Sequence, residues 1–166
     1  MDGWDNFFVA MAGAAVAFAG LVLVSVSINL DRIIKQPGLI GRAAGPFVVL
    51  FALFTASSIV LIPDQRLALY GIELIILALT FAILIGVVLR NQRNSAREAA
   101  ERNLSPEHSF AFRSLLCAFI ALALMAAGVV LAAGEEKGAF FIAPAMIAGC
   151  VLAFVEAWVL LIEIDR

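Results

Sequence analysis

The chain has 166 residues, of which 64% are hydrophobic, and its formal net charge at pH 7 is -2. Five apolar stretches fill most of this length and leave no room for a soluble domain of ordinary size. The small negative charge and the lack of a soluble basic face exclude nucleic-acid binding.

The sequence predicts an all-α polytopic membrane bundle in which five transmembrane helices form a single domain. A helical span needs about 20 predominantly apolar residues. Strands of a membrane barrel would alternate apolar and polar residues, and these stretches do not. The predicted spans cover approximately residues 7–29, 43–62, 67–89, 112–133 and 139–163.

The first stretch is predicted to stay as a transmembrane helix, because its leader is acidic where a cleaved signal peptide needs positive charge. Two of its faces favour close contact with other helices. One carries Gly13, Ala17, Gly20 and Ser27, and the other carries Ser25 and Asn29. Two such faces predict a central place in the bundle for this helix.

Two short linkers, residues 63–66 and 134–138, are typical of tight turns between antiparallel helices. The second span is therefore predicted to pack on the third, and the fourth on the fifth. The third helix is predicted to continue beyond its span, since Arg97/Glu101 and Glu98/Arg102 are pairs at i,i+4. Ser105 and Pro106 predict the start of the next helix.

The distribution of Lys and Arg predicts the orientation, with the N-terminus outside and the C-terminus inside. In that topology two basic residues, Arg66 and Lys137, lie outside. Nine lie inside: Arg32, Lys35, Arg42, Arg90, Arg93, Arg97, Arg102, Arg113 and Arg166. The basic inner loops are expected to contact anionic lipid headgroups.

Glu156 is the main candidate for an intramembrane site, because it lies about 10 Å inside the fifth span and cannot easily reach water. It shares a small-residue face with Ala145, Ala148, Gly149 and Ala153. In a functional interpretation Glu156 binds a proton or cation. In a structural one it forms an ion pair with Arg113, which the hairpin register places about one turn away.

Three further polar residues belong to the candidate site. Glu73 is predicted to lie level with Ser57 and Ser58, where hydrogen bonds within the hairpin would satisfy it. Ser25 and Asn29 leave two alternatives open. Asn29 and Asp31 close a polar pocket with Glu156 and Arg113, or Asn29 only caps the end of the first helix.

No other chemistry is indicated by the sequence. Cys117 and Cys150 have no pairing pattern and are interpreted as packing residues. His108 has no Cys or carboxylate at ligand spacing, so no metal site is predicted. Neither a nucleophile motif nor a glycine-rich phosphate loop is present. We therefore expect no cofactor and no enzymatic activity.

Part of the N-terminal third carries a resemblance, in residues 4–9 (WDNFFV), 20–33 (GLVLVSVSINLDRI) and 41–43 (GRA). These segments resemble a group of small bacterial polytopic membrane proteins, some of which are labelled automatically as modulators of a membrane protease. The resemblance implies a bacterial inner-membrane location and brings no catalytic residues.

The leading functional hypothesis is a non-enzymatic membrane protein that acts through helix contacts, as an accessory or regulatory partner of a membrane complex. Its partner would be another membrane protein or a second copy of the chain. The alternative is a small oligomeric channel or proton-coupled carrier whose pathway includes Glu156.

Overall fold

The computed structural model describes residues 3–35, 37–101 and 109–162, and every regular element in these ranges is helical. A short 3₁₀ turn, η1 (Glu136–Gly138), precedes the last helix. The α-helices are α1 (Asp5–Ile28), α2 (Leu30–Lys35), α3 (Pro37–Val60), α4 (Leu67–Glu101), α5 (Ser109–Ala132) and α6 (Ala139–Ile162).

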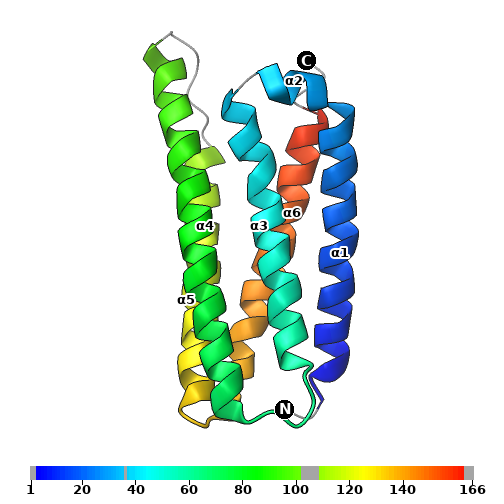
Figure 1. Ribbon diagram of the computed structural model, residues 1–166, viewed down its shortest axis with the longest axis vertical. Helices are drawn as coiled ribbons and strands as arrows, with labels where there is room; N and C mark the ends of the chain where they lie inside the picture. The colour runs from blue at the N-terminus through cyan, green and yellow to red at the C-terminus, as the bar shows by residue number, and fades with distance from the viewer. Residues whose placement is uncertain (1–2, 36, 102–108, 163–166) are drawn as a thin grey trace.

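Five of these helices are long and apolar enough to cross a membrane, as the sequence predicts. The candidate spans are Asp5–Ile28, Ala43–Val60, Leu67–Asn94, Phe110–Ala132 and Glu136–Val159. Their ends agree with the predicted spans to within a few residues. Among the described α-helices, α2 is the one short helix, and it lies across one end of the bundle (Figure 1).

The long helices form a closed ring in the order α1, α3, α4, α5, α6, and α6 returns to α1. Helices α3 and α6 also contact each other across the ring. Both predicted hairpins are present, since α3 packs on α4 and α5 packs on α6. We call the end with residues 61–66 and 133–138 the hairpin end, and the opposite end the α2 end (Figure 1).

Local backbone geometry explains the two tight reversals at the hairpin end. After α5, Gly134 has a φ of 89°, a left-handed conformation that costs glycine little. Its amide donates to the carbonyl of Leu131, and that of Glu135 donates to Val130. In the other reversal Asp64 has a φ of 57°, and the Tyr70 hydroxyl donates to the carbonyl of Ile62.

Small residues let α4 and α5 approach most closely. A Cβ atom added to Gly71 would lie 2.3 Å from the backbone nitrogen of Ala132, and one added to Gly128 would lie 2.9 Å from the carbonyl oxygen of Gly71. The small face predicted for the last span packs similarly, because a Cβ at Gly149 would meet Leu53 of α3 at 2.5 Å. Close backbone approach at small residues is the usual way in which membrane helices gain packing energy.

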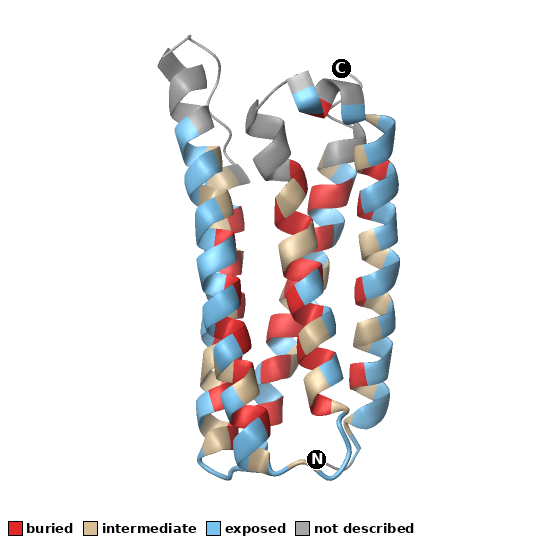
Figure 2. Cartoon of the chain, in the orientation of Figure 1, coloured by how far each residue is buried: buried red, intermediate tan, exposed pale blue. Residues whose placement is uncertain are grey.

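The predicted central position of the first helix is wrong. Helix α1 contacts α3 and α6 along one side only, and its predicted small-residue face points out of the bundle (Figure 2). Within the most apolar part of each span, 17% of α1 is buried, against 56% of α3. The central helices are α3 and α6, since each contacts three others of the ring.

Helix α4 continues to Glu101, beyond its apolar span, as predicted. The side chains of the predicted pairs Arg97/Glu101 and Glu98/Arg102 lie outside the described residues, as do Ser105 and Pro106. The basic positions predicted to be cytoplasmic lie toward the α2 end, except Arg102 and Arg166, which also lie outside the described residues. Arg66 and Lys137 lie at the hairpin end.

Candidate functional site

An ion pair between Arg113 and Glu156 is the centre of the candidate site. Arg113 follows one turn after the start of α5, and Glu156 lies near the end of α6, so the antiparallel hairpin brings them to one level. Nε of Arg113 donates to Oε1 of Glu156, and Nη2 donates to Oε2 at 2.6 Å. The two residues are 7% and 5% exposed. A fork of two parallel bonds is the strongest geometry for a guanidinium and a carboxylate.

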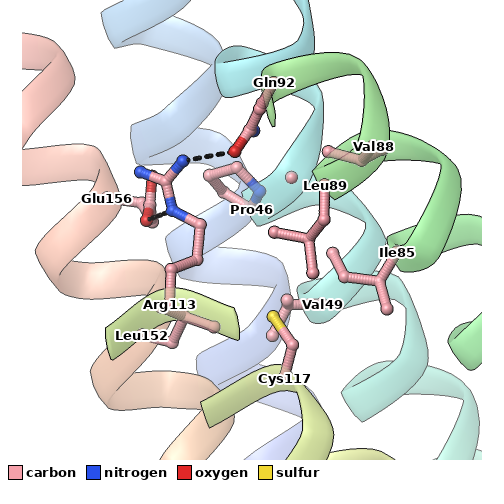
Figure 3. Close-up of a pocket in the computed structure, with 11 residues that line it drawn as sticks. Pro46, Val49, Ile85, Val88, Leu89, Gln92, Arg113, Cys117, Leu152 and Glu156 are labelled. Atoms are coloured by element: carbon pink, nitrogen blue, oxygen red, sulfur yellow. Dashed lines mark hydrogen bonds and ion pairs between the residues drawn. The ribbon is translucent and has the colours of Figure 1, made fainter. Parts of the chain in front are cut away.

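Gln92 of α4 extends this pair into a network of three helices. Its Oε1 accepts a hydrogen bond from Nη1 of Arg113 at 2.7 Å (Figure 3). All three nitrogen atoms of the guanidinium therefore donate to a protein oxygen. The network connects α4, α5 and α6 near the α2 end and fixes how they are rotated relative to one another.

A small hollow with about 250 Å³ of empty space, including its open mouth, adjoins the network. Its polar wall is Gln92, Arg113 and Glu156. The rest is mostly apolar and comes from four helices (Figure 3): Gly45, Pro46, Val49, Ile85, Val88, Leu89, Cys117 and Leu152. The absence of a side chain at Gly45 leaves space beside Gln92, since an added Cβ would come within 4.0 Å of Nε2.

The chemistry of the network follows from its burial. Inside the helix bundle the attraction between opposite charges is weakly screened, but each charge also loses its hydration. Both carboxylate oxygens of Glu156 accept from Arg113, so its charge is compensated inside the protein. Such a pair holds helices in one arrangement, and the loss of either member leaves the other charge buried.

Ser25 and Asn29 are not among the residues that line the hollow. The buried Ser25 hydroxyl donates to the carbonyl of Leu21 at 2.8 Å. Asn29 is the residue at which α1 ends, and its Nδ2 donates to the carbonyl of Ser25 at 3.1 Å. This geometry agrees with the second alternative, in which Asn29 caps the end of α1. The side chain of Asp31 lies outside the described residues.

Glu73 lies six residues after the start of α4, at the opposite end from the network. The hydrogen bonds predicted for it within the α3–α4 hairpin are not formed. Its Oε2 atom is buried and has no hydrogen-bond partner among the described residues. The hydroxyls of Ser57 and Ser58 are bonded elsewhere, to Met146 Sδ at 3.9 Å and to the carbonyl of Phe54 at 2.8 Å.

Gln92 is the site residue that sequence reasoning missed. It falls in the polar run after the third predicted span, where the sequence predicts that the helix continues but singles out only charged pairs. The sequence does contain a signal for Gln92. Because α4 and α5 are antiparallel, a residue just after the third predicted span faces a residue near the start of the fourth. Arg113 and Gln92 stand in that relation.

The remaining sequence candidates do not add chemistry to the site. Cys117 is buried and lines the hollow, and Cys150 is half-buried; both are free thiols. In the part of the chain that the structure describes, no group of three His, Cys, Asp or Glu residues could hold a metal ion. His108 lies outside that part.

Comparison with protein-family models, curated protein sequences and solved structures finds no match to this chain. The resemblance of its N-terminal segments stays a prediction.

Proposed function

We propose that this chain is a non-enzymatic integral membrane protein that acts through helix contacts, as an accessory or regulatory partner of a larger membrane complex. The observation that carries the proposal is the pairing of Glu156. Both of its carboxylate oxygens accept hydrogen bonds from Arg113, and both residues are more than nine-tenths buried. The most prominent intramembrane acid is thus occupied by the protein's own cation, which favours a structural role.

The outer surface of α1 supports the same proposal. Gly13, Gly20 and Ser27 are exposed there, and nothing lies within 4 Å of a Cβ added to either glycine. These residues are small although no helix in the described part of the chain packs against them. A membrane surface of small residues allows the backbone of another helix to approach closely.

We propose a bacterial inner-membrane location with the N-terminus outside and the C-terminus inside. The all-helical architecture supports the inner-membrane location. The excess of basic positions toward the α2 end supports the orientation. Arg90 and Arg93, both exposed near the end of the α4 span Leu67–Asn94, would then lie at the level of anionic headgroups in the inner leaflet.

Ion flux through sealed liposomes separates this proposal from a channel or proton-coupled carrier. The purified protein should give no Glu156-dependent proton or cation flux, because a conducting site must let an ion enter and leave. Flux that disappears in Glu156→Gln would overturn the proposal if circular dichroism and size exclusion show that the variant is folded. Glu135→Gln, which changes an exposed acid in the loop at the hairpin end, is the matched control.

A further inference from the structure

Glu73 is an intramembrane acid whose environment differs from that of Glu156. It lies about 9 Å along α4 from Leu67, at a rise of about 1.5 Å per residue, and within the apolar span Leu67–Asn94. The side chain is half-buried and its Oε2 atom is fully covered, without a hydrogen-bond partner among the described residues. A buried carboxyl oxygen without a donor is costly, and more so within a membrane.

Among the described residues, the helices packed against α4 supply no cation to Glu73. Helix α4 packs on α3 and α5. The described side chains of α3, residues 43–60, carry no charge. Among those of α5, residues 110–132, the one charged group is Arg113, which binds Glu156 and Gln92 toward the α2 end. On α4 itself, Arg90 and Arg93 lie beyond two-thirds of the span.

The charged groups in the loops near Glu73 are exposed and form no ion pair with it. Asp64 and Arg66 precede α4, and Arg66 is about 10 Å from Glu73 along the helix axis. Glu135, Glu136 and Lys137 lie in the other loop of the hairpin end. Nor do the nearby hydroxyls serve Glu73: Tyr70 donates to the carbonyl of Ile62, and Thr80 to that of Ile76.

Glu73 also borders the outer face of the bundle. Leu69, Ile76 and Thr80, at i−4, i+3 and i+7, are all exposed, and these positions share one face of a helix with Glu73. Gly71, which packs against α5, points almost oppositely, since two residues turn a helix by about 200°. A helix placed against this outer face would therefore contact the carboxyl group. Rotation of the Glu73 carboxyl group about χ3 would bring Oε2 to this outer face, because that terminal torsion has broad minima.

We infer that Glu73 is the docking point for a transmembrane helix of a partner protein, and that this helix carries an Arg or Lys side chain at the depth of Glu73. This inference rests on the proposed function and names the chemistry of the partner. Charge complementarity supports this partner. The chain pairs its other intramembrane acid, Glu156, with a buried arginine, and intramembrane charges generally pair with one another.

The partner is a different protein rather than a second copy of this chain. At the hairpin end, the described residues hold two basic side chains, Arg66 and Lys137. Arg66 lies in the loop before α4, and Lys137 is the second residue of the candidate span Glu136–Val159, in η1 before α6 begins. Both therefore lie at the end of the bundle, whereas Glu73 lies about 9 Å further along α4 from Leu67. A second copy with the same orientation in the membrane therefore brings no cation to the depth of Glu73.

A binding measurement with synthetic helices tests this inference. The full chain is placed in phosphatidylcholine nanodiscs, and association with a fluorescent Leu/Ala transmembrane peptide is followed by energy transfer. Three peptides are compared, with Arg, Leu or Glu six residues from one end. The Arg peptide should bind about tenfold more tightly than the Leu peptide, a ratio typical of one polar contact between membrane helices. The Glu peptide should bind more weakly than either.

Variants then assign the preference to Glu73. In Glu73→Gln the preference for Arg should fall to about one, and in the control Glu135→Gln it should stay near tenfold. Equal binding of the Arg and Leu peptides by the wild-type chain would overturn the inference, and that comparison does not depend on any variant folding. The inference would also be overturned if Glu73→Gln still bound the Arg peptide more tightly than the Leu peptide. Self-association of the chain that depends on Glu73 and excludes the peptides would overturn it as well. Flux in liposomes tests the proposed function independently, so the two failures are distinguishable.

Discussion

Arg113 of α5 holds both carboxylate oxygens of Glu156 of α6, across a separation of 43 residues in the chain. The contact closes the α5–α6 hairpin near the α2 end, and Gln92 attaches it to α4. In the low dielectric of the bundle interior, such a pair stabilises the fold mainly because neither charge is buried without its partner. The contribution of the pair to the stability of the fold therefore depends on both residues being present.

The first prediction is a double-mutant cycle on this pair. Arg113→Ala should destabilise the protein by about 3–5 kcal/mol, because it leaves the Glu156 carboxylate buried without a counter-charge. Glu156→Gln should partly rescue Arg113→Ala, since it removes that charge. Unfolding in mixed detergent micelles measures each variant. Effects that simply add in the double mutant would show that the two side chains do not interact.

A second prediction compares two glycines in the membrane spans. Gly71→Ala should destabilise the bundle by about 1–3 kcal/mol, because the new methyl would lie 2.3 Å from the backbone nitrogen of Ala132 and force α4 away from α5. Gly20→Ala meets nothing within 4 Å, so it should be neutral or stabilise α1 by up to about 1 kcal/mol through helix propensity. Thermal unfolding in one detergent measures both. Similar losses for the two variants would contradict the close contact of α4 and α5.

The sequence predicts the spans and the hairpins well because both depend on simple properties, namely apolar length and short polar linkers. The Arg113–Glu156 pair could also be predicted, since counting residues from the turn fixes the register of an antiparallel hairpin. The position of α1 could not be predicted. Its two small-residue faces look alike in sequence, and only the packing of residues such as Phe8 and Val22 shows which face is buried.

Hydrogen-bond partners were the hardest feature to predict. Ser58 lies level with Glu73 in the predicted register, and Thr80 lies on the same helix face as Glu73, but each hydroxyl donates to a carbonyl four residues earlier in its own helix. A hydroxyl in a helix has that acceptor close at hand. The sequence does not show whether a serine or threonine bonds to its own helix or to its neighbour, and at Glu73 this choice decides whether the acid has a donor.

A third prediction follows from the contrast between the two intramembrane acids. Glu73→Leu should stabilise the isolated protein by about 1 kcal/mol, because it removes a covered oxygen that has no donor. Glu156→Leu should destabilise it by about 3–5 kcal/mol, since Arg113 is left buried and unpaired. Both are read from the same unfolding measurement in detergent. A loss of stability in Glu73→Leu would mean that the acid has a stabilising contact within the chain.

The fourth prediction concerns orientation in the membrane, and it uses two exposed residues at opposite ends of the bundle. Lys137 lies in the α5–α6 loop at the hairpin end, and Asn94 lies on α4 toward the α2 end. In a background with Cys117 and Cys150 replaced by alanine, Lys137→Cys should react with an impermeant maleimide in intact cells. Asn94→Cys should react only after permeabilisation, because basic residues flanking spans are retained in the cytoplasm. Labelling of both from the same side would contradict a membrane crossing by α5, which lies between the two positions, and with it the five-span prediction. The reversed pattern would keep five spans and contradict the proposed orientation, because the excess of basic residues would then lie outside.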